Sequence, residues 1–299
     1  MVTVSEFEIQ NRRKKKFVNQ DKLFDIIVTA VMIFTAVLFL LPLLYVLSCS
    51  FTNPDVVLTG KASLFPIGFT TTGYVKVFQN KLLISGFKNS LIYTAIGTLI
   101  SVTVQMLCAY PLSRKDFKLR GPINFIFVLT MFIGGGMIPN YLLIINLHLL
   151  NTMWAVILPA CCSVFSIVVV RTYMENSISY ELQEAARVDG CSDFGIFIRI
   201  ILPLCRPILF VITLFAIVGF WNSYFSALLY LSDTSLFPLQ RVLQDILVVS
   251  ESAVGGEDPA VQEQLKYVTI VVSSLPLLII YPFFQKYFEK GMTIGGMKG

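Results

Sequence analysis

Charged residues and histidine are scarce in this sequence. Of its 299 residues, 14% are charged, whereas a soluble domain carries about 25%, so the chain lacks the ions that would cover a water-exposed surface. With a single histidine, His148, we expect no zinc site and no histidine-based catalytic triad built within this chain. None of the six cysteines has C-x-x-C spacing, and we interpret them as small buried residues. We therefore expect no catalytic residue and no metal site.

Apolar residues take the place of the missing charges. They make up 56% of the chain, and the mean hydropathy is +0.75. Uncharged apolar runs recur that are long enough, at about 18 residues or more, to cross about 30 Å of hydrocarbon. These runs exclude a soluble enzyme, a nucleic-acid-binding domain and a disordered protein, and they predict an all-α, polytopic membrane protein. We expect a basic tail over 1–22 and one transmembrane domain over 23–299, with six spans at 24–49, 91–112, 123–143, 153–170, 207–229 and 267–287.

Lysine and arginine are unevenly distributed between the expected spans. Seventeen of the 23 basic residues fall in the N-terminal tail, in the loops 113–122 and 171–206, and in the C-terminal tail. Because cytoplasmic segments of membrane proteins carry the excess of Lys and Arg, we expect both termini in the cytoplasm and the protein in the cell membrane. The basic cluster at 12–16 is accordingly interpreted as a topology signal rather than as a nucleic-acid-binding site.

The chain carries no recognisable energy source for transport. The pattern G-x-x-x-x-G-K-[ST] does not occur, so ATP cannot be bound here through a P-loop. Ion-coupled carriers usually keep carboxylates or histidines at membrane depth, but here Asp25 and Arg206 lie only at the edges of spans. The sequence therefore favours an external motor or a passive pore, and it predicts no cofactor bound by this chain.

The loop over 178–203, between the fourth and fifth spans, is the most informative segment. Ser179 and Ser192 are suitable N-caps and Gly190 is a suitable helix end, so we expect two short helices around a glycine hinge. At helical spacing, the second helix carries one apolar stripe. The stripe consists of Phe194, Phe197, Ile198 and Ile201.

The first of these two helices presents small and acidic side chains together. Its alanines allow another surface to approach closely, while its acids are able to pair with basic residues on that surface. The residues concerned are Leu182, Ala185 and Ala186 beside Glu181, Glu184 and Asp189. This composition favours contact with a partner.

At this point the sequence resembles a known family. Glu184-Ala185-Ala186, then Gly190 after three residues and 200–203 (Ile-Ile-Leu-Pro) after nine more, match the EAA loop of ATP-binding-cassette importer permeases. The rest of the chain resembles the carbohydrate branch, and within it the second permease of maltose-type transporters. The matching runs are GGGMIP at 134–139, LLNT at 149–152, WNSYF at 221–225, PLQ at 238–240 and PFFQKYF at 282–288. One departure is Ser179, where many relatives have proline; serine also opens helices, so we expect little consequence.

The resemblance implies a type I importer fold and a coupling mechanism. In this family the EAA helices insert into a groove on the ATPase subunit, and the tail of this permease, here 288–299, reaches between the two ATPases. The implied ATPase-coupling residues are Glu184, Ala185, Ala186, Asp189, Gly190, Phe194, Phe197, Gly295, Gly296 and Lys298. Glycines in the tail allow an extended backbone to enter a narrow cleft; a frayed terminus is the alternative. The implied partners are a second homologous permease, two ATPases that bind ATP and Mg, and an extracytoplasmic solute-binding protein docked on the outer segments 51–90 and 230–266.

Sugars place their apolar faces on aromatic rings and their hydroxyls on amide and hydroxyl groups. The residues that offer this chemistry are Trp221, Asn222, Tyr224 and Phe225 in the fifth span, Gln105 in the second, and Asn140 and Tyr141 after the glycine run. As one helix, the fifth span would place Trp221, Tyr224 and Phe225 on one face. Two alternatives remain open: Trp221 belongs to the aromatic belt at the outer interface, and the polar side chains bond neighbouring helices.

The sequence therefore predicts a permease subunit that imports a carbohydrate, and more specifically an oligosaccharide, by ATP-driven alternating access. A permease for a peptide or an amino acid, or a membrane sensor, is the alternative. The glycine run 134–136 with Pro139 is expected to break the third span, either as a hinge for alternating access or for close helix packing. No residue identifies the glycan.

Overall fold

The computed structural model describes the backbone of residues 4–249 and 258–296, and within these segments every regular element is helical. The all-α prediction is therefore confirmed. The chain divides into two units, one made of residues 1–74 and 257–271, the other of 75–256 and 272–299. Two helices, α3 (Thr72–Gln79) and α15 (Pro259–Gly296), contribute to both units.

The first unit contains the long helix α1 (Val4–Phe51), the short helix α2 (Pro54–Leu58) and the start of α15. Residues 24–51 of α1 are apolar and long enough to cross a membrane. Gln264 on α15 is fully buried, and its Nε2 donates to the backbone carbonyls of Thr52 at 2.7 Å and Ser50 at 3.3 Å. This amide fastens the first turns of α15 to the chain at the end of α1.

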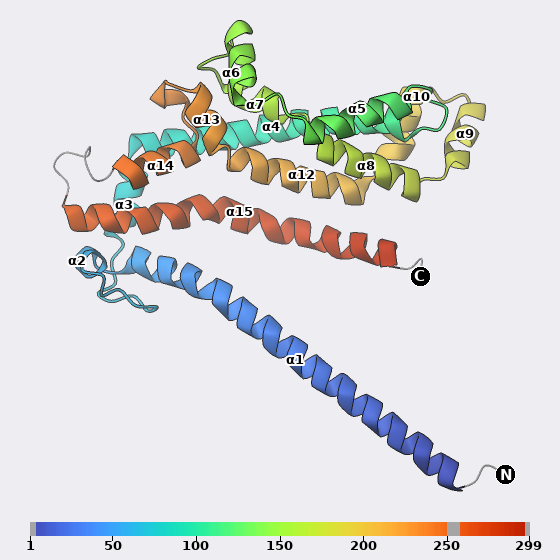
Figure 1. The fold of residues 1–299 in the computed structure, drawn as a ribbon. Coiled ribbons are helices and arrows are strands. Elements are labelled where there is room, and N and C mark those ends of the chain that lie inside the picture. Colours follow the sequence, from blue (N-terminus) through green and yellow to red (C-terminus); the bar gives the residue numbers. More distant parts are fainter. Residues whose placement is uncertain (1–3, 250–257, 297–299) are drawn as a thin grey trace. The chain divides into compact units, whose positions relative to one another are not determined.

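The second unit is built around α4 (Lys81–Ser113), which packs against α7, α8, α12 and α14 (Figure 1). Its other elements, in chain order, are α5 (Arg120–Phe132), α6 (Met137–Asn146), α7 (Met153–Ala160), α8 (Val164–Ser177), α9 (Tyr180–Val188), α10 (Asp193–Ile196), the π-helix η1 (Phe197–Ile201), α11 (Leu202–Leu204), α12 (Arg206–Trp221), α13 (Tyr224–Tyr230), the 3-10 helix η2 (Thr234–Leu236) and α14 (Leu239–Val249). The second half of α15 completes the unit.

Three of the described helices are long and apolar enough to cross a membrane by themselves. They are 24–51 of α1, α4 and 259–285 of α15. Three bent pairs pass the same test together: α5 with α6, bent by 113°, α7 with α8, bent by 41°, and the segment 193–204 with α12, bent by 83°. The helices therefore allow up to six spans by length and composition, in the regions where the sequence predicts six.

The bend between α5 and α6 falls on the glycine run, as predicted. Gly136 precedes α6 with a φ of 84°, a conformation that L side chains rarely adopt. The division of the expected fifth span 207–229 was not predicted. Helix α12 ends at Trp221, and Asn222 and Ser223 form a turn before α13. The prediction that Trp221, Tyr224 and Phe225 share one helical face is therefore wrong.

The α4–α12 contact requires a residue without a side chain at position 97. A Cβ atom on Gly97 would lie 2.7 Å from the ring of Phe220 on α12. Phe220 is buried, so its ring has little room to move away. The two helices thus approach closely at this point, because glycine leaves room for the ring of Phe220.

We expect Gly97→Ile to force α4 and α12 apart and to lower the free energy of unfolding by about 1–3 kcal/mol, the usual cost of overpacking a core. Thermal unfolding of the detergent-purified protein measures the effect. Gly219→Ile is the matched control, because a Cβ there meets no atom within 4 Å. Equal unfolding temperatures for the two variants would contradict this packing.

Polar side chains of α4 hold the segment between α13 and α14. Asn89 Nδ2 donates to the carbonyls of Ser235 at 2.7 Å and Phe237 at 3.1 Å, and the Tyr93 hydroxyl donates to the Leu236 carbonyl at 2.8 Å. The Ser90 hydroxyl accepts the N–H of Leu239 at 2.8 Å. These bonds satisfy backbone groups of η2 and its flanks, which have few partners of their own, and so fix the start of α14 on α4.

Candidate coupling site and substrate pathway

The loop after α8 folds into the two helices that the sequence predicts. Helix α9 follows Ser179, whose backbone is extended, and it ends before Asp189. Gly190 has a φ of 79°, and the next N–H, that of Cys191, donates back to the Ala186 carbonyl at 2.9 Å. Ser192 then caps α10 by accepting the Gly195 N–H at 3.2 Å. Glycine is required at the hinge because this φ strains other residues.

Helix α9 has a buried side and an exposed side. Gln183 and Ala186 are buried, and Ala186 belongs to the core around the C-terminal end of α4. The opposite side, which we call the outer face of α9, consists of Glu181, Leu182, Glu184, Ala185, Val188 and Asp189, all exposed. Val188 is 88% exposed. An apolar side chain so fully exposed, on a face that also carries three acids, is typical of a contact surface.

The apolar stripe expected on the second helix is only partly present. Helix α10 ends at Ile196 and continues as the five-residue π-helix η1, which shifts the spacing of the side chains that follow. Phe197 and Ile201 are buried as expected, and the Phe197 ring lies 5.2 Å from that of Tyr110 on α4. Phe194 is 65% exposed. Its ring lies 6.5 Å from that of Phe197, so of the two phenylalanines expected to take part in coupling only Phe197 is buried in the core.

Four charged side chains form a closed ring where this loop meets α4. Arg114, directly after α4, binds Asp116 through Nη2 at 2.7 Å and Nε at 3.0 Å, and Asp193 on α10 through Nη1 at 2.7 Å. Arg187 in the last turn of α9 binds the same two carboxylates, Asp116 at 2.9 Å and Asp193 at 3.1 Å. We call Arg114, Asp116, Arg187 and Asp193 the charge ring.

The most deeply buried member of the charge ring is Arg114. Its side chain is only 8% exposed. Burial disfavours the charged guanidinium, but its hydrogen bonds to Asp193 and Asp116 outweigh burial and raise the pKa of Arg114 above its usual value. The arginine is therefore charged, and its Nη1 also donates to the Tyr110 hydroxyl at 3.0 Å.

Sequence reasoning did not identify the charge ring. Two of its four pairs join residues 71 and 79 positions apart, so no local pattern shows that the two arginines and two aspartates meet. The one available hint was an arginine and an aspartate two residues apart directly after an apolar run, in a segment interpreted only as a topology signal.

The C-terminal coupling candidates lie at the limit of the described residues. Helix α15 continues through Gly295 and Gly296, so these glycines are helical, and the extended backbone expected here is not found. Lys298 lies outside the described residues.

Two of the expected pathway residues are buried in helix contacts. Trp221 is 2% exposed, its ring meets Phe87 edge-on at 5.8 Å, and its Nε1 donates to the Ser273 carbonyl at 3.1 Å. Gln105 is 2% exposed, and its Nε2 donates to the Ser101 hydroxyl at 2.7 Å. Ser101 in turn donates to the Cys161 carbonyl at 3.0 Å, at the bend between α7 and α8. Trp221 thus connects helices, as one of the open alternatives holds, whereas Gln105 bonds a residue of its own helix and its Oε1 is buried without a partner.

The other pathway candidates lie on or near the surface of α6 and α13. Asn140 and Phe225 are exposed, and Tyr224 is half-buried. Tyr141 is half-buried and stacks on Tyr230 of α13, with ring centres 6.2 Å apart. Asn222, in the turn after α12, is exposed, and its amide donates to the Val218 carbonyl at 3.0 Å. The candidates therefore separate into a buried pair and a set near α6 and α13.

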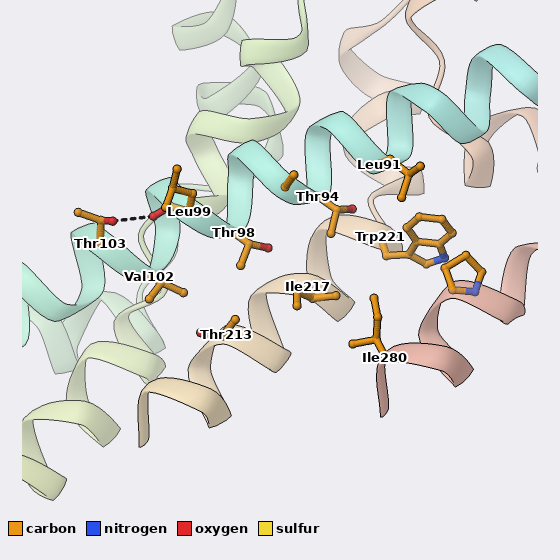
Figure 2. A pocket seen from close by; sticks show the side chains of 12 residues that line it. Leu91, Thr94, Thr98, Leu99, Val102, Thr103, Thr213, Ile217, Trp221 and Ile280 are labelled. Atoms are coloured by element: carbon orange, nitrogen blue, oxygen red, sulfur yellow. Dashed lines mark hydrogen bonds between the residues drawn. The ribbon is translucent and has the colours of Figure 1, made fainter. Parts of the chain in front are cut away.

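A cavity of about 440 Å³ lies between α4, α12 and α15 (Figure 2). Trp221 lines it, whereas the other pathway candidates do not. Thr103 and Thr213 bond carbonyls of their own helices, but the hydroxyls of Thr94 and Thr98 are buried without a partner. The rest of the lining is hydrocarbon. Two free hydroxyls are too few to replace the water that surrounds a sugar, so the geometry does not favour this cavity as a sugar site.

Comparisons with known proteins agree with the fold. Residues 12–294 match the family described as binding-protein-dependent transport system inner membrane component. The polygalacturonan/rhamnogalacturonan transport system permease protein YtcP of Bacillus subtilis is 37% identical over 94% of this chain and 100% of its own length. The arabinooligosaccharides transport system permease protein AraQ of Halalkalibacterium halodurans is 31% identical over 89% of this chain and 94% of its own.

A solved structure supports the same assignment. A chain in the crystal structure of a bacterial ABC transporter that imports the acidic polysaccharide alginate superposes with a TM-score of 0.84 and 32% identity, covering 90% of this chain and 98% of that one. The family indicated by the spacing of the EAA loop, and the type I importer fold that it implies, are thereby confirmed. The chain belongs to the family of binding-protein-dependent transport system inner membrane components, and it is a non-catalytic permease subunit of an ABC transporter.

Proposed function

We propose that this permease imports an oligosaccharide into the cytoplasm by alternating access, driven by ATP that separate subunits hydrolyse. The observation that carries the proposal is the similarity to YtcP over 94% of the chain. The names of YtcP, AraQ and the alginate transporter all refer to chains of sugar units. This shared chemistry favours a carbohydrate over the peptide or amino acid that the sequence left open.

The proposed topology has six spans with both termini in the cytoplasm. The three long helices and three bent pairs support the number of spans, and the concentration of Lys and Arg supports the orientation. In this orientation α9, α10 and the charge ring face the cytoplasm, whereas α13 and η2 face outward. In this topology a solute-binding protein would dock, on the outer side of the membrane, on residues 51–90 and 230–266.

The outer face of α9 is the proposed docking surface for an ATPase. Glu181, Glu184 and Asp189 would pair with basic side chains of a groove, while Ala185 permits close approach and Val188 enters an apolar pocket. Two ATPases, one for this permease and one for a second, homologous permease, would bind ATP and Mg between them. We assign to the same docking contact Gly190, Phe197 and the end of α15.

The proposed substrate pathway passes the exposed polar and aromatic residues near α6 and α13. Asn140 and Asn222 offer amides, and Tyr141, Tyr224 and Phe225 offer rings for the apolar faces of sugar units. The bend between α5 and α6 at Gly136 is proposed as the hinge. Trp221 is assigned to helix packing, because its Nε1 is bonded inside the protein, and Gln105 is assigned to the same role because it is buried and its Nε2 donates to Ser101.

Uptake by the reconstituted four-subunit transporter tests the proposal. The vesicles enclose ATP, and the binding protein is outside with labelled galacturonide oligosaccharides, arabino-oligosaccharides or a peptide mixture. We expect accumulation of one class of oligosaccharide that stops when a non-hydrolysable ATP analogue replaces ATP. Accumulation of peptides, without accumulation of any glycan, would refute the carbohydrate assignment and leave the permease family intact.

A further inference from the structure

Three consecutive residues hold the helix α9 at both of its ends. Arg114 and Asp116 reach the last turn of α9 through the charge ring, in which Asp116 binds Arg187 directly at 2.9 Å. Lys115 lies between them in sequence, and its Nζ lies 5.9 Å from the centre of the ring of Tyr180, the first residue of α9. Contacts at two ends fix the direction of a nine-residue helix as well as its position.

The segment 114–116 directly continues α4. Arg114 is the residue after the last turn of α4, and its Nη1 bonds the Tyr110 hydroxyl one turn earlier at 3.0 Å. Helix α4 in turn packs against α7, α8, α12 and α14. A displacement of the segment therefore acts on the helix with the most neighbours in this unit.

The chemistry of the contact suits the transmission of force. Arg114 donates two hydrogen bonds to the carboxylate of Asp116, and this bidentate geometry fixes the orientation of the two side chains as well as their distance. Separating Asp116 or Asp193 from Arg114 would leave a buried guanidinium with fewer partners, so these three side chains are expected to move together. Arg187 joins α9 to them through both carboxylates.

We infer that the segment 114–116 is the positioning element that transmits the movement of α9 to α4, with Asp116 as its central residue. The inference rests on the proposed function, because an ATPase must pull on α9 for any movement to be transmitted. In this proposal Asp116 and Arg114 couple ATP hydrolysis to transport, but they touch neither ATP nor the substrate.

The experiment measures transported oligosaccharide per ATP hydrolysed in the reconstituted transporter carrying Asp116→Asn. Asparagine preserves the shape of the side chain and removes the charge that both arginines bind. We expect the complex to assemble and hydrolyse ATP, with transport per ATP lower by about tenfold, within the usual range of coupling between sites. Arg187→Gln and the double variant are expected to give losses that are not additive, because both open the same ring.

Glu175→Gln is the matched control. Glu175 also joins two segments through two arginines, Arg171 at 3.0 Å and Arg120 at 3.7 Å, and neither arginine lies on α9. We expect its transport per ATP to equal that of the unchanged protein. Asp193→Asn opens the ring from the other side at a residue that is 64% exposed, so it decides the question if Asp116→Asn does not assemble.

An unchanged ratio of transport to hydrolysis in the ring variants would overturn the inference, even if yield or thermal stability fell, because a purely structural contact predicts that result. Glu184→Lys separates this failure from failure of the proposed function. If Glu184→Lys releases the ATPases while Asp116→Asn keeps the normal ratio, docking stands and the positioning role is wrong. If Glu184→Lys leaves the ATPases bound and coupled, the proposed docking surface itself is wrong.

Discussion

Replacing Val188 by aspartate is expected to weaken binding of the ATPase to the permease by about 30-fold. Val188 is 88% exposed in the last turn of α9, on its outer face, and side chains that anchor an interface cost about 2 kcal/mol or more when they are lost. Aspartate also carries its charge into the pocket that the valine would fill. A titration of the detergent-purified permease pair with labelled ATPase measures the change.

The control for this prediction adds the same charge elsewhere. Asn176 is exposed near the end of α8, outside α9, and Asn176→Asp is expected to bind the ATPase as the unchanged protein does. Equal weakening by both variants would mean that the added charge acts at long range. Unchanged binding of Val188→Asp would show that α9 is not the docking helix.

Replacing Trp221 by alanine is expected to destabilise the protein without changing which glycan it transports. Removing a buried Trp costs about 3–5 kcal/mol in a core, and here the indole also bonds the Ser273 carbonyl and meets Phe87. We expect a clear drop in the thermal unfolding temperature, with a smaller drop for Trp221→Phe, which keeps an aromatic ring.

Phe225→Ala is the counterpart on α13. Phe225 is 59% exposed, so its loss is expected to leave the unfolding temperature unchanged while lowering oligosaccharide uptake. Unfolding curves and uptake rates of the same preparations check both statements. The reverse result, a stable Trp221→Ala protein with altered glycan preference, would place the substrate pathway at the end of α12 instead of at α6 and α13.

Much of the architecture follows from the sequence, because the features concerned are local. Apolar runs and scarce charge predict membrane helices, and the glycine run predicts the break before α6. The EAA spacing with Gly190 predicts two helices around a hinge. At the two breaks the residue type itself imposes the structure, because glycine adopts the backbone conformations of Gly136 and Gly190 without strain.

The features that were missed depend on contacts between distant segments. The turn at Asn222 and Ser223 contains neither glycine nor proline, so nothing local separates α13 from α12. The π-helix at Phe197–Ile201 shifts the apolar pattern, and Phe194 and Ile198 of the expected stripe are exposed. The charge ring joins Arg114 to Asp193, which lies 79 residues further along the chain. Such contacts become visible only when the fold is known.

The most direct measurement is the ATPase rate of the reconstituted transporter in the presence of its binding protein, with and without an oligosaccharide, for the unchanged permease and for Glu184→Lys. The account predicts that the loaded binding protein stimulates hydrolysis and that Glu184→Lys abolishes this stimulation, because the introduced lysine would repel the basic groove that Glu184 binds. Stimulation by peptides and by no glycan, or stimulation that Glu184→Lys leaves unchanged, would contradict the account.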